Sequence, residues 1–240
     1  MDKTRLDQAL VLRGLAPTRS QAESLVKLGQ VLVNSQPAHK PGQLVSEADT
    51  IRLTSTEQYV SRAGLKLASV SKVLKLDFRG KTVLDVGSST GGFTDYALRH
   101  GAAKVIAVDV GTNQLHPSLQ GHVQIELHEK TDIRDYTTDQ KIDIVVADVS
   151  FISLREILPS VKKLCDKDTQ LAIMVKPQFE AGQSSFKHKG VIKNDKIRRD
   201  ILRGFEDWAH QYFVILDKAD SDVAGSKGNR ERFYLLRILS

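Results

Sequence analysis

The sequence predicts an α/β protein in which a small α+β module precedes a seven-stranded, mostly parallel sheet with helices on both faces. From residue 80 onward, apolar runs of strand length alternate with helical segments at the spacing of βαβ units. Before residue 55, short helices and strands follow one another in too few residues for a large core. The chain has 240 residues, which is long enough for one full α/β domain and such a module.

The second helix of the small module has a start signal in the sequence. The Thr18 hydroxyl can accept a backbone hydrogen bond while Gln21 returns one, which is a capping box. A Lys40-Pro41-Gly42 turn separates the two strands that follow. The expected elements are helices over 5–13 and 18–29, strands over 31–34 and 50–53, a polar linker at 56–64 and a helix at about 65–76. The predicted domains are therefore 1–55 and 65–240, joined by the linker.

Seven segments of the second domain have strand character. The expected strands are 82–86, 104–108, 123–127, 142–147, 170–176, 213–218 and 232–238. The last two are close in sequence and joined by a polar loop, so we expect them to form a closing hairpin. After Asn194, the residues Ile197, Ile201, Phe205 and Trp208 recur at helical spacing. This pattern predicts a helix that docks its apolar stripe on the sheet.

The most informative stretch follows the first strand of this sheet. The apolar run TVLDV has the acidic Asp85 just before its last residue and breaks into the glycine-rich turn of DVGSSTGGFTD. Gly87, Gly91 and Gly92 allow the backbone to approach a ligand closely, at the start of a helix with free N–H groups. The next apolar run, KVIAVD, ends in Asp109, whose carboxylate can take both hydroxyls of a ribose. The spacing differs from the G-x-G-x-x-G of dinucleotide enzymes. A plain strand-turn-helix without a ligand is the alternative.

Charge and composition indicate the class of partner and the compartment. The net charge is +6, and both ends of the chain are basic while the middle is acidic. This distribution favours a polyanionic partner such as nucleic acid, with an ordinary basic surface as the alternative. There is one cysteine, Cys165, and the seven histidines are scattered, so we expect neither a disulfide nor a structural metal. No apolar run approaches a membrane span and no secretory signal is visible, which predicts a soluble, cytoplasmic protein.

Four charged residues occupy positions suited to chemistry. Lys66 lies on the helix before the glycine turn, Asp148 ends IVVAD, Lys176 ends LAIMVK, and Glu231 lies shortly before the last strand. Ligands of open α/β sheets bind at the carboxyl ends of strands, so Asp148 and Lys176 should face the same crevice as Gly87. A lysine close to another cation and shielded from water can act as a general base.

The first module resembles the S4 RNA-binding domain. The segments RLDQAL, TRSQAESLV, GQVLVN and KPG carry this resemblance over residues 3 to about 55. The family lays basic side chains of a two-helix platform along the RNA backbone. The resemblance implies phosphate contacts by Arg5, Arg19 and Lys27, with Arg62 beyond the module and weaker candidates at Arg13 and Lys40. Such contacts should make binding depend on salt. A helical cap that only packs on the second domain is the alternative.

The second domain resembles class I methyltransferases, which have a Rossmann-like sheet and bind S-adenosylmethionine. The resemblance rests on three features in this order: an acidic residue at the end of a strand, the glycine-rich turn that follows it, and a second acidic residue after the next strand. Together with SRAGLKL, ADVSFISL, MVKPQFEAG and GSKGNRERF, they resemble the TlyA family, often called hemolysin A and related to the FtsJ-type ribose methyltransferases. That family methylates the ribose 2′-hydroxyl of cytidines in ribosomal RNA, on the large subunit and in some members also on the small subunit.

The resemblance also implies residue roles. Lys176 would be the general base, Asp148 would tune it near the donor methyl, and Lys66 and Glu231 would orient the ribose. The implied cofactor contacts are Asp85, Gly87, Ser88, Ser89, Thr90, Gly91, Gly92, Phe93, Asp109, Val110, Asp132, Ile133 and Asp148. Asp132 departs from the Asn expected near the adenine, and Asp222 stands where Pro is common.

Other functions remain as alternatives at this point. A ribosome-binding or assembly protein could retain cofactor binding without catalysis. A membrane-lytic role, which the name hemolysin suggests, lacks an amphipathic basic helix or an export signal, and a dinucleotide oxidoreductase is disfavoured by the turn spacing. We expect ribosomal RNA or a ribosomal subunit as partner, no membrane, and a monomer. The loop PQFEAGQSSFKHKG is interpreted as a lid that orders on substrate.

Overall fold

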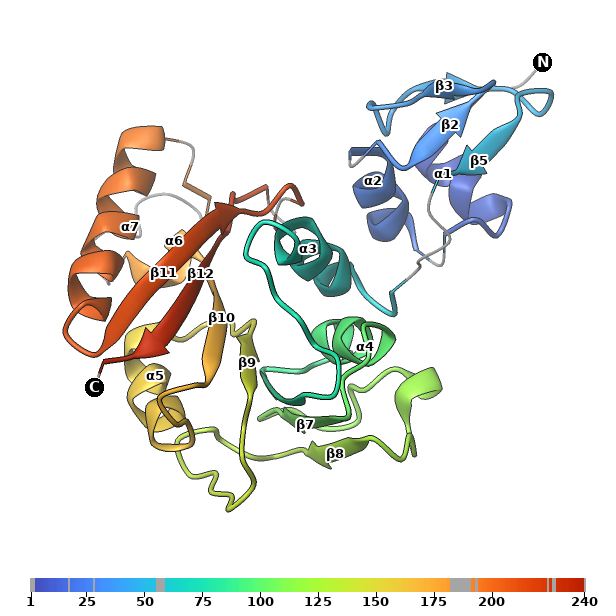
Figure 1. Cartoon of the computed structure of the whole chain (residues 1–240). Helices are drawn as coiled ribbons and strands as arrows, with labels where there is room; N and C mark the ends of the chain where they lie inside the picture. Colours follow the sequence, from blue (N-terminus) through green and yellow to red (C-terminus); the bar gives the residue numbers. More distant parts are fainter. Residues whose placement is uncertain are drawn as a thin grey trace.

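The computed structural model describes residues 3–16, 18–27, 29–54, 59–181, 191–192, 194–223, 225 and 228–239. They form a small N-terminal module and a larger domain built on one seven-stranded sheet (Figure 1). The module, drawn in blue, lies to one side of the larger domain in Figure 1. The expected α/β class and the order of its two parts are confirmed.

Two short helices and two small antiparallel sheets make up the N-terminal module. Its elements are α1 (Leu6–Leu12), α2 (Arg19–Lys27), a sheet ordered β3 (Gln36–Pro37), β2 (Val31–Val33), β5 (Ile51–Leu53), and a pair of β1 (Thr4–Arg5) with β4 (Leu44–Val45). The strands expected at 31–34 and 50–53 are confirmed as β2 and β5, which pair antiparallel. The strands β1, β3 and β4 have two residues each, too few to show the alternation of apolar and polar residues that identifies a strand in a sequence.

The capping pattern at Thr18 is half formed. Its hydroxyl oxygen accepts a hydrogen bond from the Gln21 N–H at 3.2 Å, as expected. The Gln21 side chain takes a different role, because its Oε1 accepts from the Thr18 hydroxyl at 3.1 Å and its Nε2 donates to the Tyr59 carbonyl at 2.8 Å. Gln21 therefore links the module to the segment that leads into the larger domain.

The large sheet has the order β11-β12-β10-β9-β6-β7-β8. Its strands are β6 (Thr82–Val86), β7 (Lys104–Val108), β8 (Ile125–His128), β9 (Ile144–Ala147), β10 (Gln170–Val175), β11 (Phe213–Asp220) and β12 (Arg232–Ile238). The strands β6 to β10 pair parallel, whereas β12 runs antiparallel to both β10 and β11. The expected strands and the closing hairpin are thus confirmed, with small shifts at their ends. The strand expected at 123–127 begins two residues later, at Ile125, and Val123 before it is 96% exposed.

Helices cover both faces of the large sheet. On one face lie α3 (Arg62–Ser71) and α4 (Gly92–Arg99), on the other α5 (Leu154–Lys163) and α7 (Asp195–Ala209), with the short η1 (Pro117–Leu119) and α6 (Pro177–Glu180) in connections. Alternate residues of β6 divide between these faces, since Val83 packs with α3 and α4 while Leu84 packs with α5. The helix expected after Asn194 is confirmed, and the Asn194 side chain caps it.

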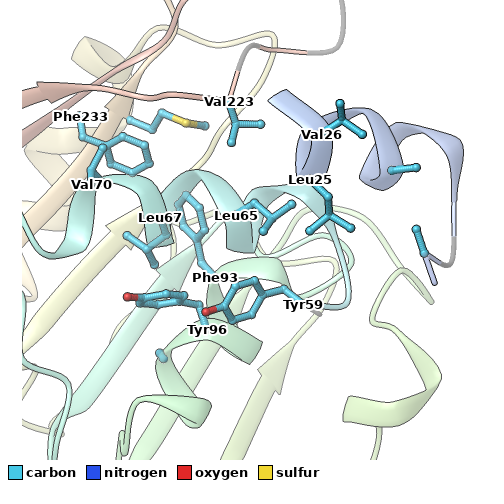
Figure 2. Packing of buried hydrophobic residues seen from close by; sticks show 14 of the residues in the cluster. Leu25, Val26, Tyr59, Leu65, Leu67, Val70, Phe93, Tyr96, Val223 and Phe233 are labelled. Carbon is cyan, nitrogen blue, oxygen red and sulfur yellow. The ribbon is translucent and has the colours of Figure 1, made fainter. Parts of the chain in front are cut away.

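The segment before the large domain is docked on it. The helix expected at about 65–76 begins earlier, at Arg62, because the Ser61 hydroxyl accepts from the Ala63 N–H and caps it. Tyr59, inside the expected linker, is 3% exposed and lies beside the Tyr96 ring at 5.3 Å. Figure 2 shows these two rings below α3, with Leu25 of α2 near Leu65. Apolar packing is therefore continuous from the module into the large domain.

In the part of the chain that the structure describes, no helix is long and apolar enough to cross a bilayer. No group of His, Cys, Asp and Glu there is arranged to hold a metal ion.

Candidate functional site

Strand register brings four charged residues to one edge and one face of the large sheet. Asp85 pairs with Val146, and Asp148 follows two residues later on the same face. Val175 pairs with Arg232, so one step beyond this pair Lys176 and Glu231 stand opposite each other on the same face. This is the face covered by α3, which carries Lys66. The expected convergence at the carboxyl ends of the strands is therefore present.

The glycine turn needs its glycines for two different reasons. Gly87 has φ +78°, and a Cβ there would lie 2.9 Å from the Asp148 carbonyl oxygen. Gly91 has φ +87°, and a Cβ there would lie 2.6 Å from the Leu119 side chain. The first glycine lets two strand ends approach each other, and the second lets η1 pack on the turn.

Asp109 organises the turn through backbone N–H groups. Its Oδ2 accepts from the Ser89 N–H at 2.8 Å and its Oδ1 from the Gly111 N–H at 2.7 Å. The Ser89 hydroxyl donates to Gln114 Oε1 at 2.8 Å. Each carboxylate oxygen can accept further hydrogen bonds, so Asp109 can still receive ligand hydroxyls.

A cavity of about 380 Å³ opens beside this turn. Predicted cofactor residues that line it are Gly87, Ser89, Asp109, Val110, Asp132, Ile133 and Asp148. Gln114, Ser150 and Phe151 also line it, although none was predicted. For Ser150 and Phe151 the signal was available, since they lie two and three residues after Asp148 at a strand end. Gln114 lies in a loop without any motif.

A smaller cavity of about 160 Å³ adjoins the first one and shares Gly87, Ser89, Asp148 and Ser150 with it. Its lining includes the predicted residues Asp85, Ser88, Thr90, Phe93 and Lys176. Gly91 and Gly92 line neither cavity, because they pack against η1 and against Ser61 and Ala63. They shape the turn from behind.

Asp85 is a buried acid on the wall of the smaller cavity. It is 1% exposed, and the Thr94 hydroxyl donates to its Oδ2 at 2.6 Å. Its Oδ1 and the Ser88 hydroxyl have no hydrogen-bond partner among the described residues. Burial raises the pKa of Asp85 to about 7, and the nearby Asp148 charge adds to this. Two unsatisfied buried oxygens beside a cavity suit a polar ligand.

Asp132 lies at the far side of the larger cavity and is held by Arg134. The guanidinium donates to both carboxylate oxygens, at 3.0 and 2.6 Å, and holds the pKa of Asp132 below its ordinary value. The Arg134 N–H adds a backbone hydrogen bond at 2.9 Å. The carboxylate is therefore charged at neutral pH and fixed in position.

Lys176 forms an ion pair at the junction of the two cavities. Its Nζ lies 2.5 Å from Asp148 Oδ1 and donates to the Ser150 hydroxyl oxygen at 2.8 Å. The Phe179 ring centroid lies 6.0 Å from the same nitrogen. Asp148 lines both cavities and Lys176 lines the smaller, so a ligand that spans them would contact this pair.

The second ion pair of the site joins α3 to the start of β12. Lys66 Nζ lies 2.5 Å from Glu231 Oε2, and the two side chains are 8% and 3% exposed. The backbone around Glu231 is fixed by its carbonyl, which accepts from the Ser221 N–H at 3.0 Å. A Cβ at Gly225 would lie 2.7 Å from Glu231 Oε1, so this loop also packs closely on the pair.

The predicted RNA contacts lie in or next to the N-terminal module. Arg5 and Arg19 both bind Asp7, whereas the Arg13 guanidinium donates to the carbonyls of Asp49 and Ser46 and braces a turn. Lys27 ends α2, but its side chain lies outside the described part; Lys40 is exposed, and Arg62 begins α3. The lid predicted around PQFEAGQSSFKHKG falls largely on residues 182–190, which are outside the described residues.

Comparison with known proteins agrees with this geometry. The model of the FtsJ-like methyltransferase family matches residues 59–238, and that of the S4 domain matches residues 4–51. The 16S/23S rRNA (cytidine-2'-O)-methyltransferase TlyA of Mycobacterium tuberculosis is 38% identical, over 98% of this chain and 90% of its own. Hemolysin A of Brachyspira hyodysenteriae is 35% identical, over 98% of this chain and 99% of its own.

A solved structure is also similar. A protein of Streptococcus thermophilus that is described as a hemolysin superposes with a TM-score of 0.73 at 34% identity, covering all of this chain and 90% of that one. The match extends over both the module and the sheet domain. The chain therefore belongs to the TlyA and hemolysin A family of FtsJ-like, S-adenosylmethionine-dependent methyltransferases with an N-terminal S4 domain.

Proposed function

We propose that this protein methylates the ribose 2′-hydroxyl of a cytidine in ribosomal RNA. The observation that carries the proposal is the Lys176–Asp148 pair at the junction of two cavities, one beside a ribose-binding acid and one beside a buried polar wall. Two relatives at 38% and 40% identity are named as methyltransferases of this specificity. The choice between 16S and 23S RNA differs between these names and stays open for this chain.

The larger cavity fits the nucleoside part of S-adenosylmethionine. Its volume of about 380 Å³ is of the size usual for small-molecule sites. Asp109 would receive the ribose hydroxyls, and Asp132 and Ile133 would lie beside the adenine. Asp85 and Ser88, with their unpartnered oxygens, would face the polar end of the cofactor through the smaller cavity. The cofactor supplies an electrophilic methyl group on a positively charged sulfur.

Lys176 is assigned as the group that takes the proton of the 2′-hydroxyl. Nζ would accept this proton while the hydroxyl oxygen bonds to the methyl group and the sulfur keeps the electron pair of the bond that breaks. Asp148 and Ser150, at 2.5 and 2.8 Å, fix the direction of Nζ and stabilise the ammonium that results. Holding Nζ in place supplies much of the rate, because the acceptor is a poor nucleophile unless its proton has a positioned partner.

Lys66 and Glu231 are assigned to the ribose. Lys176 and Glu231 stand opposite each other in the extended register of β10 and β12. Cross-strand neighbours of this kind are about 5 Å apart at Cβ, so one ribose can reach both. The Lys66 ammonium holds the Glu231 carboxylate from the α3 side.

The test is methyl transfer to ribosomal RNA in vitro. The protein is incubated with radiolabelled S-adenosylmethionine and, separately, with small and large ribosomal subunits that lack the modification. We expect label in RNA as a nuclease-resistant ribose methyl on a cytidine, which also identifies the subunit. Tight subunit binding with no label would overturn the proposal and favour an RNA-binding protein without catalysis.

A further inference from the structure

The N-terminal module contains a buried carboxylate that the proposed chemistry does not use. Asp7 is fully buried at 0% exposure, on the first turn of α1. Arg5 donates to it twice, from Nε to Oδ1 at 3.1 Å and from Nη2 to Oδ2 at 2.8 Å. Arg19 of α2 donates from Nε to the same Oδ2 at 3.0 Å. A buried charge of this kind is tolerated because it is paired on both sides.

The shared oxygen makes the two arginines neighbours. Both guanidinium groups lie within hydrogen-bonding distance of Asp7 Oδ2, so they stand side by side, although they come from different elements. Two cations at this separation would repel each other without the carboxylate. The Arg5 guanidinium holds the pKa of Asp7 below its ordinary value, so the carboxylate stays charged at neutral pH.

Both guanidinium groups keep donors that point away from Asp7. Arg5 uses one edge, Nε and Nη2, on Asp7, which leaves Nη1. Arg19 uses only Nε among the hydrogen bonds of the described residues, and Glu23 is 3.7 Å from that same atom. The side chains of Arg5 and Arg19 are 43% and 51% exposed, against 0% for Asp7. Their outer edges are therefore open to a ligand.

A glycine leaves space next to the Arg5 edge. A Cβ at Gly42 would lie 3.0 Å from Arg5 Nη1, the nitrogen without a partner on Asp7. The backbone of this turn is tied to α1, because the Leu6 N–H donates to Gln43 at 2.7 Å and the Asp7 N–H to Pro41 at 3.0 Å. These bonds hold the turn next to the Arg5 guanidinium and the start of α1.

The S4 resemblance already implies that Arg5 and Arg19 contact RNA phosphates. We propose that Asp7 is the positioning residue of these contacts: it holds the two guanidinium groups side by side, next to the turn at Gly42, so that they bind one backbone phosphate together. This inference rests on the proposed function for the identity of the RNA. A phosphate takes two parallel N–H donors from a guanidinium in a fixed fork, which a freely rotating arginine offers only at an entropic cost. Asp7 fixes both forks in advance, so the negative charge on the protein promotes binding of a polyanion.

The experiment compares Asp7→Asn with the unchanged protein in binding to unmodified ribosomal subunits at several salt concentrations. A general charge effect would tighten binding, because the variant is one unit more positive. The proposed site requires the opposite: affinity falls about tenfold, and the slope of log K against log salt decreases by about one. In methyl transfer, KM for the subunit should rise while kcat and cofactor affinity stay unchanged.

Two further variants keep the result interpretable. Arg5→Lys retains the charge on a half-exposed side chain but loses the fork, and should weaken binding about as much as Arg5→Ala. Asp77→Asn is the control. Arg79 donates to Asp77 from Nε at 2.8 Å and from Nη2 at 2.7 Å, again two residues apart but in the opposite order, on the exposed surface of the other domain. The Asp77→Asn variant should leave binding unchanged.

Thermal unfolding of each variant separates loss of the site from loss of the fold. If Arg5→Lys binds as tightly as the unchanged protein, the inference is wrong, whether or not Asp7→Asn folds. Tighter binding by a folded Asp7→Asn variant would also overturn it. An unchanged protein that neither binds nor methylates the subunits would instead refute the proposed function.

Discussion

The site contains two lysine–carboxylate pairs with the same N–O separation and different surroundings. Lys176 and Asp148 are 2.5 Å apart where two cavities meet, and Ser150 provides a further contact. Lys66 and Glu231 are also 2.5 Å apart, but both side chains are enclosed between α3 and the loop before β12. Asp148 is 16% exposed, whereas Glu231 is 3% exposed.

Equal distances between the lysine nitrogen and the carboxylate oxygen therefore do not imply equal roles for the two pairs. In the proposed mechanism the accessible pair exchanges a proton with the substrate hydroxyl, and water can solvate either partner if the other is removed. The enclosed pair holds α3 against the sheet, and removal of one partner leaves a buried charge without compensation.

The largest effect is expected at the accessible pair. Lys176→Ala should lower kcat about a thousandfold or more, because it removes the nitrogen that takes the proton in the proposed mechanism, while cofactor affinity changes less than about threefold. The measurements are single-turnover methyl transfer and cofactor titration. Lys176→Arg, which keeps the cation but does not release its proton, should be equally inactive; an active arginine variant would contradict the role as base.

The second effect concerns stability and reverses the ranking of the two pairs. Lys66→Met should lower the free energy of unfolding by about 3 kcal/mol, because it leaves the buried Glu231 carboxylate without its ion-pair partner. Lys176→Met should lower the same free energy by about 1 kcal/mol. Urea unfolding measures both. Lys81→Met, in the exposed pair with Asp143 at 3.7 Å, is a control with little expected change. Equal losses of unfolding free energy for Lys66→Met and Lys176→Met would show that the enclosed pair contributes no more to stability than the accessible pair.

The third effect tests the buried acid that adjoins the accessible pair. The pKa of Asp85 is raised to about 7 by burial, so the folded protein binds its proton more tightly than the unfolded chain. Its contribution to stability is therefore complete below about pH 4 and is lost as the pH rises through 7. Relative to Asp85→Asn, the cofactor-free protein should lose about 2 kcal/mol between pH 5 and pH 8 in urea unfolding. Parallel pH profiles would show that Asp85 does not titrate in this range.

The smallest effect is expected at Asp132, outside both pairs. Arg134 already holds its two carboxylate oxygens, and an amide in its place can keep the backbone hydrogen bond. Asp132→Asn should therefore change cofactor affinity by about twofold or less, as measured by calorimetry. A tenfold change in affinity would show that cofactor binding depends on the negative charge of the Asp132 carboxylate.

Much of the fold followed from local sequence patterns. The strands at 82–86 and 104–108 were predicted with the bounds that the structure has, since their apolar runs end sharply at acidic or glycine residues. The helix after Asn194 and the closing hairpin were equally clear. The two-residue strands of the N-terminal module and the early start of α3 were missed, because they depend on pairing partners and on the Ser61 cap rather than on periodicity.

The candidate site was predicted as a set of residues and not as an arrangement. The motifs identified the glycine turn and the four charged residues, and the strand register, extended by one residue, places Asp148, Lys176 and Glu231 on one face. Gln114 was missed because it reaches Ser89 from a separate loop, which no spacing along the chain reveals. Ser150 was missed although it lies two residues after Asp148 at a strand end, because its contact with Lys176 comes from the neighbouring strand.

Local sequence patterns were enough to specify the alternation of strands and helices, the position of the close backbone turn and the identity of the charged groups, because these depend on neighbours within a few residues. The tertiary structure alone decided which lysine pairs with which carboxylate, which pair is open to a ligand, how far burial shifts Asp85, and that Asp7 joins two arginines. The physical reason is that pairing and desolvation depend on distances between segments far apart in the chain, and these distances exist only after the sheet and its helices have packed.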